Sequence, residues 1–488
     1  MANELAPYAN RHLINGTWRE GEGTLDMPVY EPATGRLLTT VKAASLAQVD
    51  EAVEAASVAF EAWSALSINR RAEMLLKVRT LLDARADELA RVLSMDNGKT
   101  LAEARGEIGR AAEAIAGAIG APTSYYSQSG NVAPGLDARR VRYPLGVCVA
   151  VTPFNFPVMN PSMFSAWALV CGNTLVLKPS EQTPIATNTL VEIFCEAGIP
   201  DGVLSVVHGG ADVGERLVAH PKTVAVTCIT SSPVAKAIYL ACSAAGKRVQ
   251  ANGGGKNPYV VMPDCDLDRT VDGIADGAFG MSGQRCLAAS RCIVVGDVYD
   301  AFVARLVERA KAFVLGPSQD PKVTMGPVVS AASKARVVKA IETAKANGGT
   351  ILLDGREHAN RVASASDEGY LIGPSIVTGL SPKDPVDRQE VFGPFLVIHR
   401  VATFDEAIRL ANDTEFGNAG AIYTESGRHA ARFERECRAG NIGVNTFPAP
   451  PMNFQMGGMG TSFYGDVHTL GDGYMLFFTD HKVVVSRW

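Results

Sequence analysis

The pattern of apolar and polar positions changes character near residue 141. Before that point apolar residues recur at helical spacing, and Ser45 with Gln48 resembles a capping box ahead of one such stretch. A further helical stretch begins at about Arg70 and is punctuated at Asn97-Gly98, which predicts a helix C-cap. These patterns predict a run of helices in the first part of the chain.

From residue 141 onward, short apolar runs alternate with helical patterns. We expect strands at 141–152, 174–178, 203–207, 224–229 and 258–262, and helices at 163–170, 187–197, 213–219 and 234–245. Such alternation predicts a parallel sheet that is covered by helices on both faces. Dinucleotide-binding folds are built in this way, although a fold alone does not determine function.

After about Gly254 the alternation continues more loosely and predicts a second α/β domain. Helical patterns occupy 267–277, 301–313 and 331–346, and strands are expected at 375–378 and 396–400. The tail, 473–488, is interpreted as a strand with an exposed edge. Such an edge often pairs with another subunit, and the alternative is that it completes an internal sheet.

Composition narrows the class of protein. The 488 residues allow about three domains, and 47% hydrophobic with 20% charged residues excludes a disordered chain, a coiled coil or a collagen. A net charge of −5 provides no basic field for nucleic acid and no polybasic membrane patch. The chain shows no signal-peptide pattern and no apolar run of about 20 residues. With nine dispersed cysteines, we expect reduced thiols and a cytoplasmic location.

The sequence gives little support for a metal site or for a phosphate-binding glycine loop. The eight histidines form no metal-ligand spacing, so we expect no metal site. The glycine runs at 253–256 and 457–460 match neither GxGxxG nor a Walker loop, and each is better interpreted as a tight turn.

Cys286 stands out by its context. It lies in FGMSGQRCLAAS, a Gly/Ser-rich turn that enters a helical pattern, where flexible backbone at Gly283 can expose the sulfur. Arg285 and a nearby helix start would favour the thiolate, the form that attacks electrophiles. The alternative is a plain buried cysteine, which is our interpretation of Cys292.

Polar residues also follow two predicted strands, at the edge where open α/β sheets place ligands. Asn155 can donate a hydrogen bond to a developing oxyanion, or it can simply form a turn. Lys178 and Glu181 can bind ribose hydroxyls, and the carboxylate would disfavour a 2′-phosphate. The alternative for this pair is a solvated loop.

Taken together, these segments resemble the aldehyde dehydrogenase superfamily over nearly the whole chain. The segments are TPFNFP around Asn155, LKPSE at 177–181, GQRC at 283–286 and EVFGPF at 390–395. The resemblance implies an α/β protein with a Rossmann-like NAD-binding domain over 1–121 and 146–252 and a catalytic α/β domain over 253–454. A small β oligomerisation flap would comprise 122–145 and 455–488 and join a homodimer or homotetramer.

The resemblance also assigns roles. Cys286 would be the nucleophile, and Asn155 with the backbone N–H of Cys286 would form the oxyanion hole. The NAD-binding residues would be Phe154, Lys178, Glu181, Ser232, Glu390 and Phe392. Ser231 stands where the superfamily usually has Gly, next to the cofactor pyrophosphate.

One position departs from the hydrolytic members, which have a Glu where this chain has Asn252. An amide cannot accept a proton from water, so it cannot act as a general base. Thiol–thioester exchange needs less help from a base. The pattern is similar to the CoA-acylating branch, the methylmalonate-semialdehyde dehydrogenases, whose segments VQAN, SGQRCLA, FPAPPMNF and SFYGD are also present.

In that branch Arg110 and Arg285 match positions that bind a substrate carboxylate, a role that suits a guanidinium fork. Alternatively, Arg110 is a surface residue and Arg285 is the partner of a backbone carbonyl. Two departures concern the acyl pocket: the family usually has Trp-Met-Phe-Pro within 161–167, and it has His where this chain has Pro258.

The expected function is NAD-dependent oxidation of a small aldehyde through a Cys286 thioester. The acyl group, from methylmalonate or malonate semialdehyde, would pass to CoA. A hydrolytic NAD(P)-dependent enzyme that releases a free acid is the first alternative. A catalytically silent protein on the same fold is the second.

Overall fold

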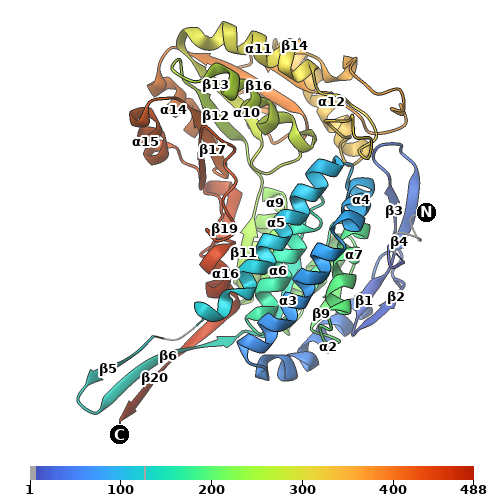
Figure 1. Ribbon diagram of the computed structural model, residues 1–488, viewed down its shortest axis with the longest axis vertical. Coiled ribbons are helices and arrows are strands. Elements are labelled where there is room, and N and C mark those ends of the chain that lie inside the picture. Colours follow the sequence, from blue (N-terminus) through green and yellow to red (C-terminus); the bar gives the residue numbers. More distant parts are fainter. Residues whose placement is uncertain (1–6, 126–127, 488) are drawn as a thin grey trace.

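Two helix-covered sheets and one projecting ribbon organise the chain (Figure 1). The computed structural model describes residues 7–125 and 128–487. Each sheet has its own hydrophobic core. The α/β architecture with a Rossmann-like unit, a second α/β unit and a small β flap is confirmed.

The first sheet has eight strands in the order β19-β11-β10-β7-β8-β9-β1-β2. Its parallel centre comprises β7 (Val147–Val151), β8 (Thr174–Lys178), β9 (Leu204–Val206), β10 (Thr223–Ile229) and β11 (Arg248–Asn252). Its antiparallel margins are β1 (His12–Ile14), β2 (Thr17–Arg19) and β19 (Phe463–Gly465). Strand order reverses at β7, which is flanked by β8 and β10, so ligands are expected at the carboxyl ends of these strands.

Helices of this unit begin and end largely where their sequence signals predict. The helices are α2 (Leu46–Ala65), α3 (Ile68–Ala84), α4 (Ala86–Asn97), α5 (Leu101–Ile119), α6 (Met159–Val170), α7 (Pro184–Glu196), α8 (Ala211–Ala219) and α9 (Ser232–Ala244). The capping box of Ser45 and Gln48 starts α2, and Gly98 ends α4 with φ +91°. Figure 1 shows α3, α5 and α6 lying side by side over the first sheet, and α5 contacts α6 extensively.

The second sheet has seven strands in the order β14-β15-β16-β13-β12-β17-β18. They are β12 (Asn257–Val261), β13 (Ala289–Val295), β14 (Thr350–Leu353), β15 (Ser375–Thr378), β16 (Phe395–Val401), β17 (Ala419–Tyr423) and β18 (Asn441–Val444), and only β14 is antiparallel to its neighbour. The predicted strand at 258–262 therefore belongs to this sheet, not to the first. The covering helices are α10 (Leu267–Phe279), α11 (Tyr299–Lys311), α12 (Ala331–Ala346), α14 (Phe404–Asn412) and α15 (Gly427–Glu436).

A three-stranded ribbon projects from the body (Figure 1). Its strands are β5 (Ser129–Ala133), β6 (Leu136–Pro144) and β20 (Thr479–Arg487), and β20 pairs antiparallel with β6 along its whole length. Because β20 lies at the margin of the three, its other edge has no strand partner among the described residues. Its side chains Val483 and Val485 are exposed.

The expectation that 473–488 is all strand is wrong in its first half. Residues Gly471–Phe478 form a helix, α16, which buries Tyr474 and Phe478 against the core of the first unit. The run YMLFF has no alternation of apolar and polar residues, and tertiary burial makes it helical. Within the predicted flap segment 455–488, β19 and α16 thus join the first unit, and β20 forms the ribbon.

No helix among residues 7–125 and 128–487 is both long and apolar enough to span a membrane.

Candidate active site

The candidate site lies where the carboxyl edge of the first sheet meets the amino edge of the second. Asn155 follows β7 and Lys178 ends β8. Cys286 precedes β13. Two asparagines come from the next two strands on one side of β13: Asn257 begins β12, and Asn418 immediately precedes β17. The prediction that Asn155 follows a strand is confirmed. Cys286, in contrast, lies before the amino end of its strand, β13.

An unusual backbone holds Cys286 in place. Met281, Ser282 and Gly283 all have positive φ, at 51°, 54° and 68°. A Cβ on Gly283 would lie 2.2 Å from the carbonyl oxygen of Gly393, so only glycine fits. Left-handed non-glycine residues cost about 1–3 kcal/mol each and persist only when their surroundings hold them. Here Ser282 Oγ donates to the Gly326 carbonyl at 2.6 Å.

The helix that was expected to follow Cys286 is absent. Residues Ala289–Val295 form strand β13 instead, and α10 ends before the cysteine, at Phe279. The two elements that adjoin Cys286 along the chain therefore direct no helix N-terminus at the sulfur. Cys292 is fully buried in β13, as we expected.

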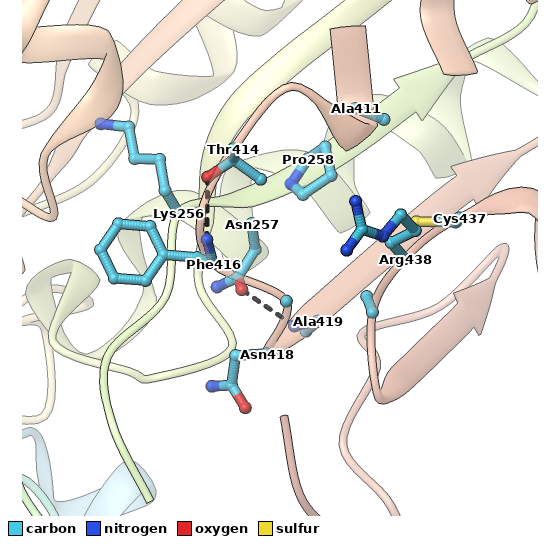
Figure 2. Close-up of a pocket in the computed structure, with 12 residues that line it drawn as sticks. Lys256, Asn257, Pro258, Ala411, Thr414, Phe416, Asn418, Ala419, Cys437 and Arg438 are labelled. Atoms are coloured by element: carbon cyan, nitrogen blue, oxygen red, sulfur yellow. Dashed lines mark hydrogen bonds between the residues drawn. The ribbon is translucent and has the colours of Figure 1, made fainter. Parts of the chain in front are cut away.

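Three amide side chains surround the Cys286 loop, and we call Asn155, Asn257 and Asn418 the amide cradle. Asn257 Nδ2 and Asn418 Nδ2 each donate to the Cys286 carbonyl at 2.9 Å. Asn257 Oδ1 accepts from the Ala419 N–H at 3.0 Å, so one side chain ties β12 to β17 (Figure 2). Sequence reasoning missed both asparagines, although each stands at the start of a predictable strand.

Asn155 completes the amide cradle from the side of the first sheet. Its Nδ2 donates to the Gln284 carbonyl at 2.9 Å, two residues before the cysteine. The amide therefore faces the loop that carries the sulfur, and it has a second N–H to donate.

A buried ion pair supports Asn155 from behind, and sequence reasoning missed it too. Lys99 pairs with Glu107, and both side chains are buried. Lys99 Nζ also donates to the Asn155 carbonyl at 2.8 Å. Glu107 Oε1 accepts from the N–H groups of Val158 and Met159, at 2.8 and 2.9 Å, where α6 begins. The pair thus fixes the turn that carries Asn155.

The expected thiolate is not favoured in this state. Burial raises the pKa of Cys286 to about 11, and the nearby Glu390 carboxylate also raises it. The Asn418 side chain and the backbone N–H groups of Cys286 and Leu287 act in the opposite direction. Arg285 is not among the groups that shift the pKa of Cys286, and its guanidinium contacts Asp276.

Cys286 and Asn155 open onto a cavity of about 450 Å³, which we call the Cys286 cavity. Both arginines line it. Arg110 is held by Glu113 at 2.7 Å and by the Pro450 carbonyl at 2.7 Å. Arg285 contacts the carbonyl and, at 3.5 Å, the carboxylate of Asp276. Its guanidinium carbon also lies 4.4 Å from the centre of the Phe447 ring.

The residues expected to hold a dinucleotide form a second group. Lys178 is 7% exposed, and its Nζ lies 3.9 Å from the exposed Glu181 carboxylate and 3.4 Å from the Pro179 carbonyl. Burial lowers its pKa. Since an ammonium has three donors, donors remain for ligand hydroxyls. Ser232 begins α9, with Ser231 as its N-cap, and Ser232 Oγ accepts from the Gly254 N–H at 3.0 Å.

Glu390 and two phenylalanines lie between these groups. Glu390 Oε1 accepts from the Gly255 N–H at 3.0 Å, and burial raises the pKa of Glu390 to about 7. A Cβ on Gly254 would lie 2.3 Å from Glu390 Oε2, which accounts for a glycine there. The rings of Phe154 and Phe392 meet edge to face at 5.6 Å.

The glycine run at 253–255 forms a packed turn within the protein. Its N–H groups are taken by the Ser462 carbonyl, Ser232 Oγ and Glu390, so the run forms a turn whose donors are already used. Asn252 ends β11, and its Nδ2 donates to the Cys228 carbonyl at 3.2 Å. Asn252 is not among the residues that line the Cys286 cavity.

Comparison with known proteins decides the family. Residues 18–484 match the model of the "Aldehyde dehydrogenase family". The chain belongs to the aldehyde dehydrogenase family. Among curated members, it is 42% identical to malonate-semialdehyde dehydrogenase 2 of Geobacillus kaustophilus (strain HTA426) over 480 residues, which is 98% of each chain. It is 38% identical to a malonate-semialdehyde dehydrogenase of Halalkalibacterium halodurans over the full length of both.

Solved aldehyde dehydrogenase structures agree closely. Methylmalonate-semialdehyde dehydrogenase from Oceanimonas doudoroffii superposes with a TM-score of 0.95 at 36% identity, covering 98% of both chains. A protein from Sinorhizobium meliloti 1021, described as a methylmalonate-semialdehyde dehydrogenase and solved in complex with NAD, gives 0.95 at 35% identity. It covers 98% of this chain and 97% of its own.

Proposed function

We propose that this aldehyde dehydrogenase oxidises malonate or methylmalonate semialdehyde with NAD and transfers the acyl group to CoA. The proposal rests on one observation above all: Cys286, Asn155, Arg110 and Arg285 line the same cavity. It is supported by the resemblance to the family, in which the hydrolytic members have a Glu at the position of Asn252. The similarity to malonate- and methylmalonate-semialdehyde dehydrogenases supports the choice of substrate.

In this mechanism the Cys286 sulfur attacks the aldehyde carbon and forms a thiohemiacetal. The carbonyl oxygen becomes an oxyanion, which the free N–H of Asn155 and the backbone N–H of Cys286 stabilise. One such donor is typically worth about 2.7–4 kcal/mol in the transition state. Arg110 and Arg285 would bind the substrate carboxylate after it displaces Glu113 and Asp276.

The carboxyl edge of the first sheet fits NAD. Lys178 and Glu181 offer a donor and an acceptor for ribose hydroxyls at the topological switch point, and the exposed carboxylate disfavours a 2′-phosphate. Glu390 offers acceptors for the second ribose, with Phe154 and Phe392 beside it. Ser232 lies at the start of α9, where a pyrophosphate is favoured. Bound there, NAD supplies the hydride acceptor for the oxidation.

The amide at Asn252 bears on how the acyl group leaves Cys286. Its amide donates to a carbonyl and cannot take a proton from water, so hydrolysis lacks a base at this position. The CoA thiol instead forms a bond to the thioester carbon, the bond to Cys286 breaks, and the CoA thiol proton passes to the Cys286 sulfur or to solvent.

We further propose that the first unit binds the dinucleotide, the second carries the nucleophile, and the ribbon joins subunits. The partner-free edge of β20, with Val483 and Val485 exposed, supports pairing with another copy in a homodimer or homotetramer. A cytoplasmic location is consistent with nine free cysteines.

The test is NADH formation from both semialdehydes, with and without CoA, with the products identified by mass spectrometry. We expect CoA-dependent turnover that yields acetyl-CoA from malonate semialdehyde and propionyl-CoA from methylmalonate semialdehyde. Each product requires that the substrate carboxylate leave as CO2 along the path, a decarboxylation that the resemblance to the family implies. Free acid formed at the same rate without CoA would establish the hydrolytic alternative. The variant Cys286→Ala should lose turnover entirely, because no other cysteine is among the residues that line the cavity. Its circular dichroism spectrum should match that of the wild type.

A further inference from the structure

The Cys286 cavity is larger than a semialdehyde requires. Its volume is about 450 Å³. Because even a liquid water occupies about 30 Å³, a semialdehyde of about six non-hydrogen atoms takes up at most about 180 Å³. More than half of the cavity would remain free beside such a substrate.

Apolar side chains form most of the wall. The apolar residues that line it are Phe156, Met159, Met163, Ile229, Met281, Leu287, Phe447, Ala449, Pro450, Met452, Met456 and Leu470. Five are methionines, whose unbranched, flexible side chains adjust to ligands of different shape. They come from three parts of the chain: α6 carries two, the loop before Cys286 carries Met281, and the segment after Phe447 carries the other two. A wall of this kind suits a hydrocarbon chain.

The charges around the cavity do not select for an anion alone. The lining holds Arg110 and Arg285, but it also holds three carboxylates, Glu103, Glu107 and Asp276. Each arginine already has an acidic partner, Glu113 or Asp276. An uncharged aldehyde can therefore enter without leaving a guanidinium unpaired.

Met163 belongs to the part of the cavity wall that α6 provides. It is 1% exposed and lines the cavity, within the stretch 161–167 that departs from the usual pattern of the family. The one tryptophan of that stretch, Trp167, lies elsewhere: its ring is 5.8 Å from that of Tyr474, in the core beneath α16. No tryptophan is among the residues that line the cavity.

We infer that the enzyme also oxidises uncharged aliphatic aldehydes of about five to eight carbons, and that Met163 is the residue that admits them. The inference rests on the proposed Cys286 chemistry and extends its substrate class beyond carboxylated semialdehydes. The chemical step is unchanged: Cys286 attacks the aldehyde, NAD accepts the hydride, and CoA takes the acyl group.

The test compares propanal, pentanal, hexanal and octanal with malonate semialdehyde, all with NAD and CoA. Each buried methylene is typically worth about fourfold in binding. We therefore expect kcat/KM to rise at least tenfold from propanal to hexanal. A value that stays flat or falls over this series would overturn the inference.

Variants locate the effect. Met163→Trp should lower the ratio of hexanal to propanal kcat/KM by tenfold or more, because the indole fills the cavity beside α6. Met163→Leu, which nearly conserves volume, should leave the ratio within about twofold. Leu76→Trp, on the exposed face of α3, is the matched control for adding an indole and should change neither rate. Met452→Phe fills the opposite wall and tests the same idea if Met163→Trp fails to fold.

The outcomes separate this inference from the proposed function. Turnover of malonate semialdehyde without hexanal turnover contradicts the inference alone. Hexanal turnover to free hexanoic acid, independent of CoA, contradicts the proposed acyl acceptor and leaves the cavity inference standing. A readout that needs no turnover is alkylation of Cys286 by iodoacetamide. Hexanamide should protect the cysteine at a concentration at least tenfold lower than propanamide, and equal protection would overturn the inference.

Discussion

The amide cradle and the Cys286 cavity adjoin each other but are built from opposite materials. In the cradle, Asn155, Asn257 and Asn418 hold backbone carbonyls at 2.9 Å, and the loop they hold contains three consecutive left-handed residues. The cavity is lined by methionines and by arginines that have exchangeable partners. Hydrogen bonds fix geometry to tenths of an ångström, whereas flexible apolar contacts tolerate different shapes. This protein thus places a loop fixed by hydrogen bonds beside a cavity whose apolar side chains can adjust.

Among changes to the amide cradle, removal of the Asn155 side-chain amide should have the largest effect on activity. We expect Asn155→Ala to lower kcat by about 10²–10³-fold with little change in KM, because an oxyanion donor acts mainly in the transition state. Asn155→Asp, which keeps the shape but removes the donors, should lose at least as much. Steady-state kinetics with malonate semialdehyde provides the measurement. A loss of less than about fivefold would mean that the amide does not contact the oxyanion.

The second prediction concerns the pH at which Cys286 loses its proton, which can be measured without substrate. The pKa of Cys286 is raised to about 11. At pH values below this pKa, the fraction of reactive thiolate rises about tenfold each time the pH increases by one unit. Alkylation by iodoacetamide, followed by peptide mass spectrometry, should therefore accelerate about 100-fold from pH 7 to pH 9. Buried Cys292 serves as the unreactive control. A plateau that begins near pH 7 would contradict the raised pKa.

The support behind Asn155 should matter less than Asn155 itself. Lys99→Met leaves the buried Glu107 unpaired, so we expect a loss of about 3–5 kcal/mol in the free energy of unfolding. We also expect kcat to fall about tenfold, because the Asn155 carbonyl loses its partner. In the double variant with Glu107→Gln, most of the stability should return while kcat stays low. Recovery of kcat together with stability would assign the pair a purely structural role.

The smallest effect on the kinetics is expected from a change in the lining of the Cys286 cavity. Asp276→Asn removes the carboxylate that competes with substrate for Arg285, and exposed ion pairs are worth about 0.2–1 kcal/mol. The KM for malonate semialdehyde should fall about threefold, while kcat and the kinetics with propanal stay constant. An equal change for both aldehydes would show that Asp276 acts on the cavity as a whole and not through the carboxylate site.

Local signals predicted much of the fold because they act over a few residues. The capping box at Ser45, the C-cap at Gly98 and most of the alternation after residue 141 lead to the elements observed. The strand expected at 141–152 is wrong as one element: it is divided between β6 of the ribbon and β7 of the first sheet. The failures occurred where burial overrode local pattern. Gly471–Phe478 is helical because its aromatic residues enter the first core, and the segment after Cys286 is a strand because it pairs between β12 and β16.

For the candidate site, residue types were easier to predict than their surroundings. Motifs pointed to Cys286, Asn155 and the two arginines, which line one cavity, but the roles of these residues stay predictions. Asn257, Asn418 and the pair of Lys99 and Glu107 were missed, because their partners lie up to 132 residues away along the chain. The raised pKa of Cys286 was missed for the same reason, since burial depends on every element packed around the sulfur.

The sequence by itself determined the α/β class, the family resemblance, the nucleophile candidate and the amide at Asn252, since each depends on residue identity or on short-range spacing. The tertiary structure alone decided how three asparagines converge on the Cys286 loop, and how large and apolar the adjoining cavity is. The physical reason is that hydrogen-bond partners, burial and cavity volume are properties of segments brought together from distant parts of the chain. No local stretch of sequence specifies them.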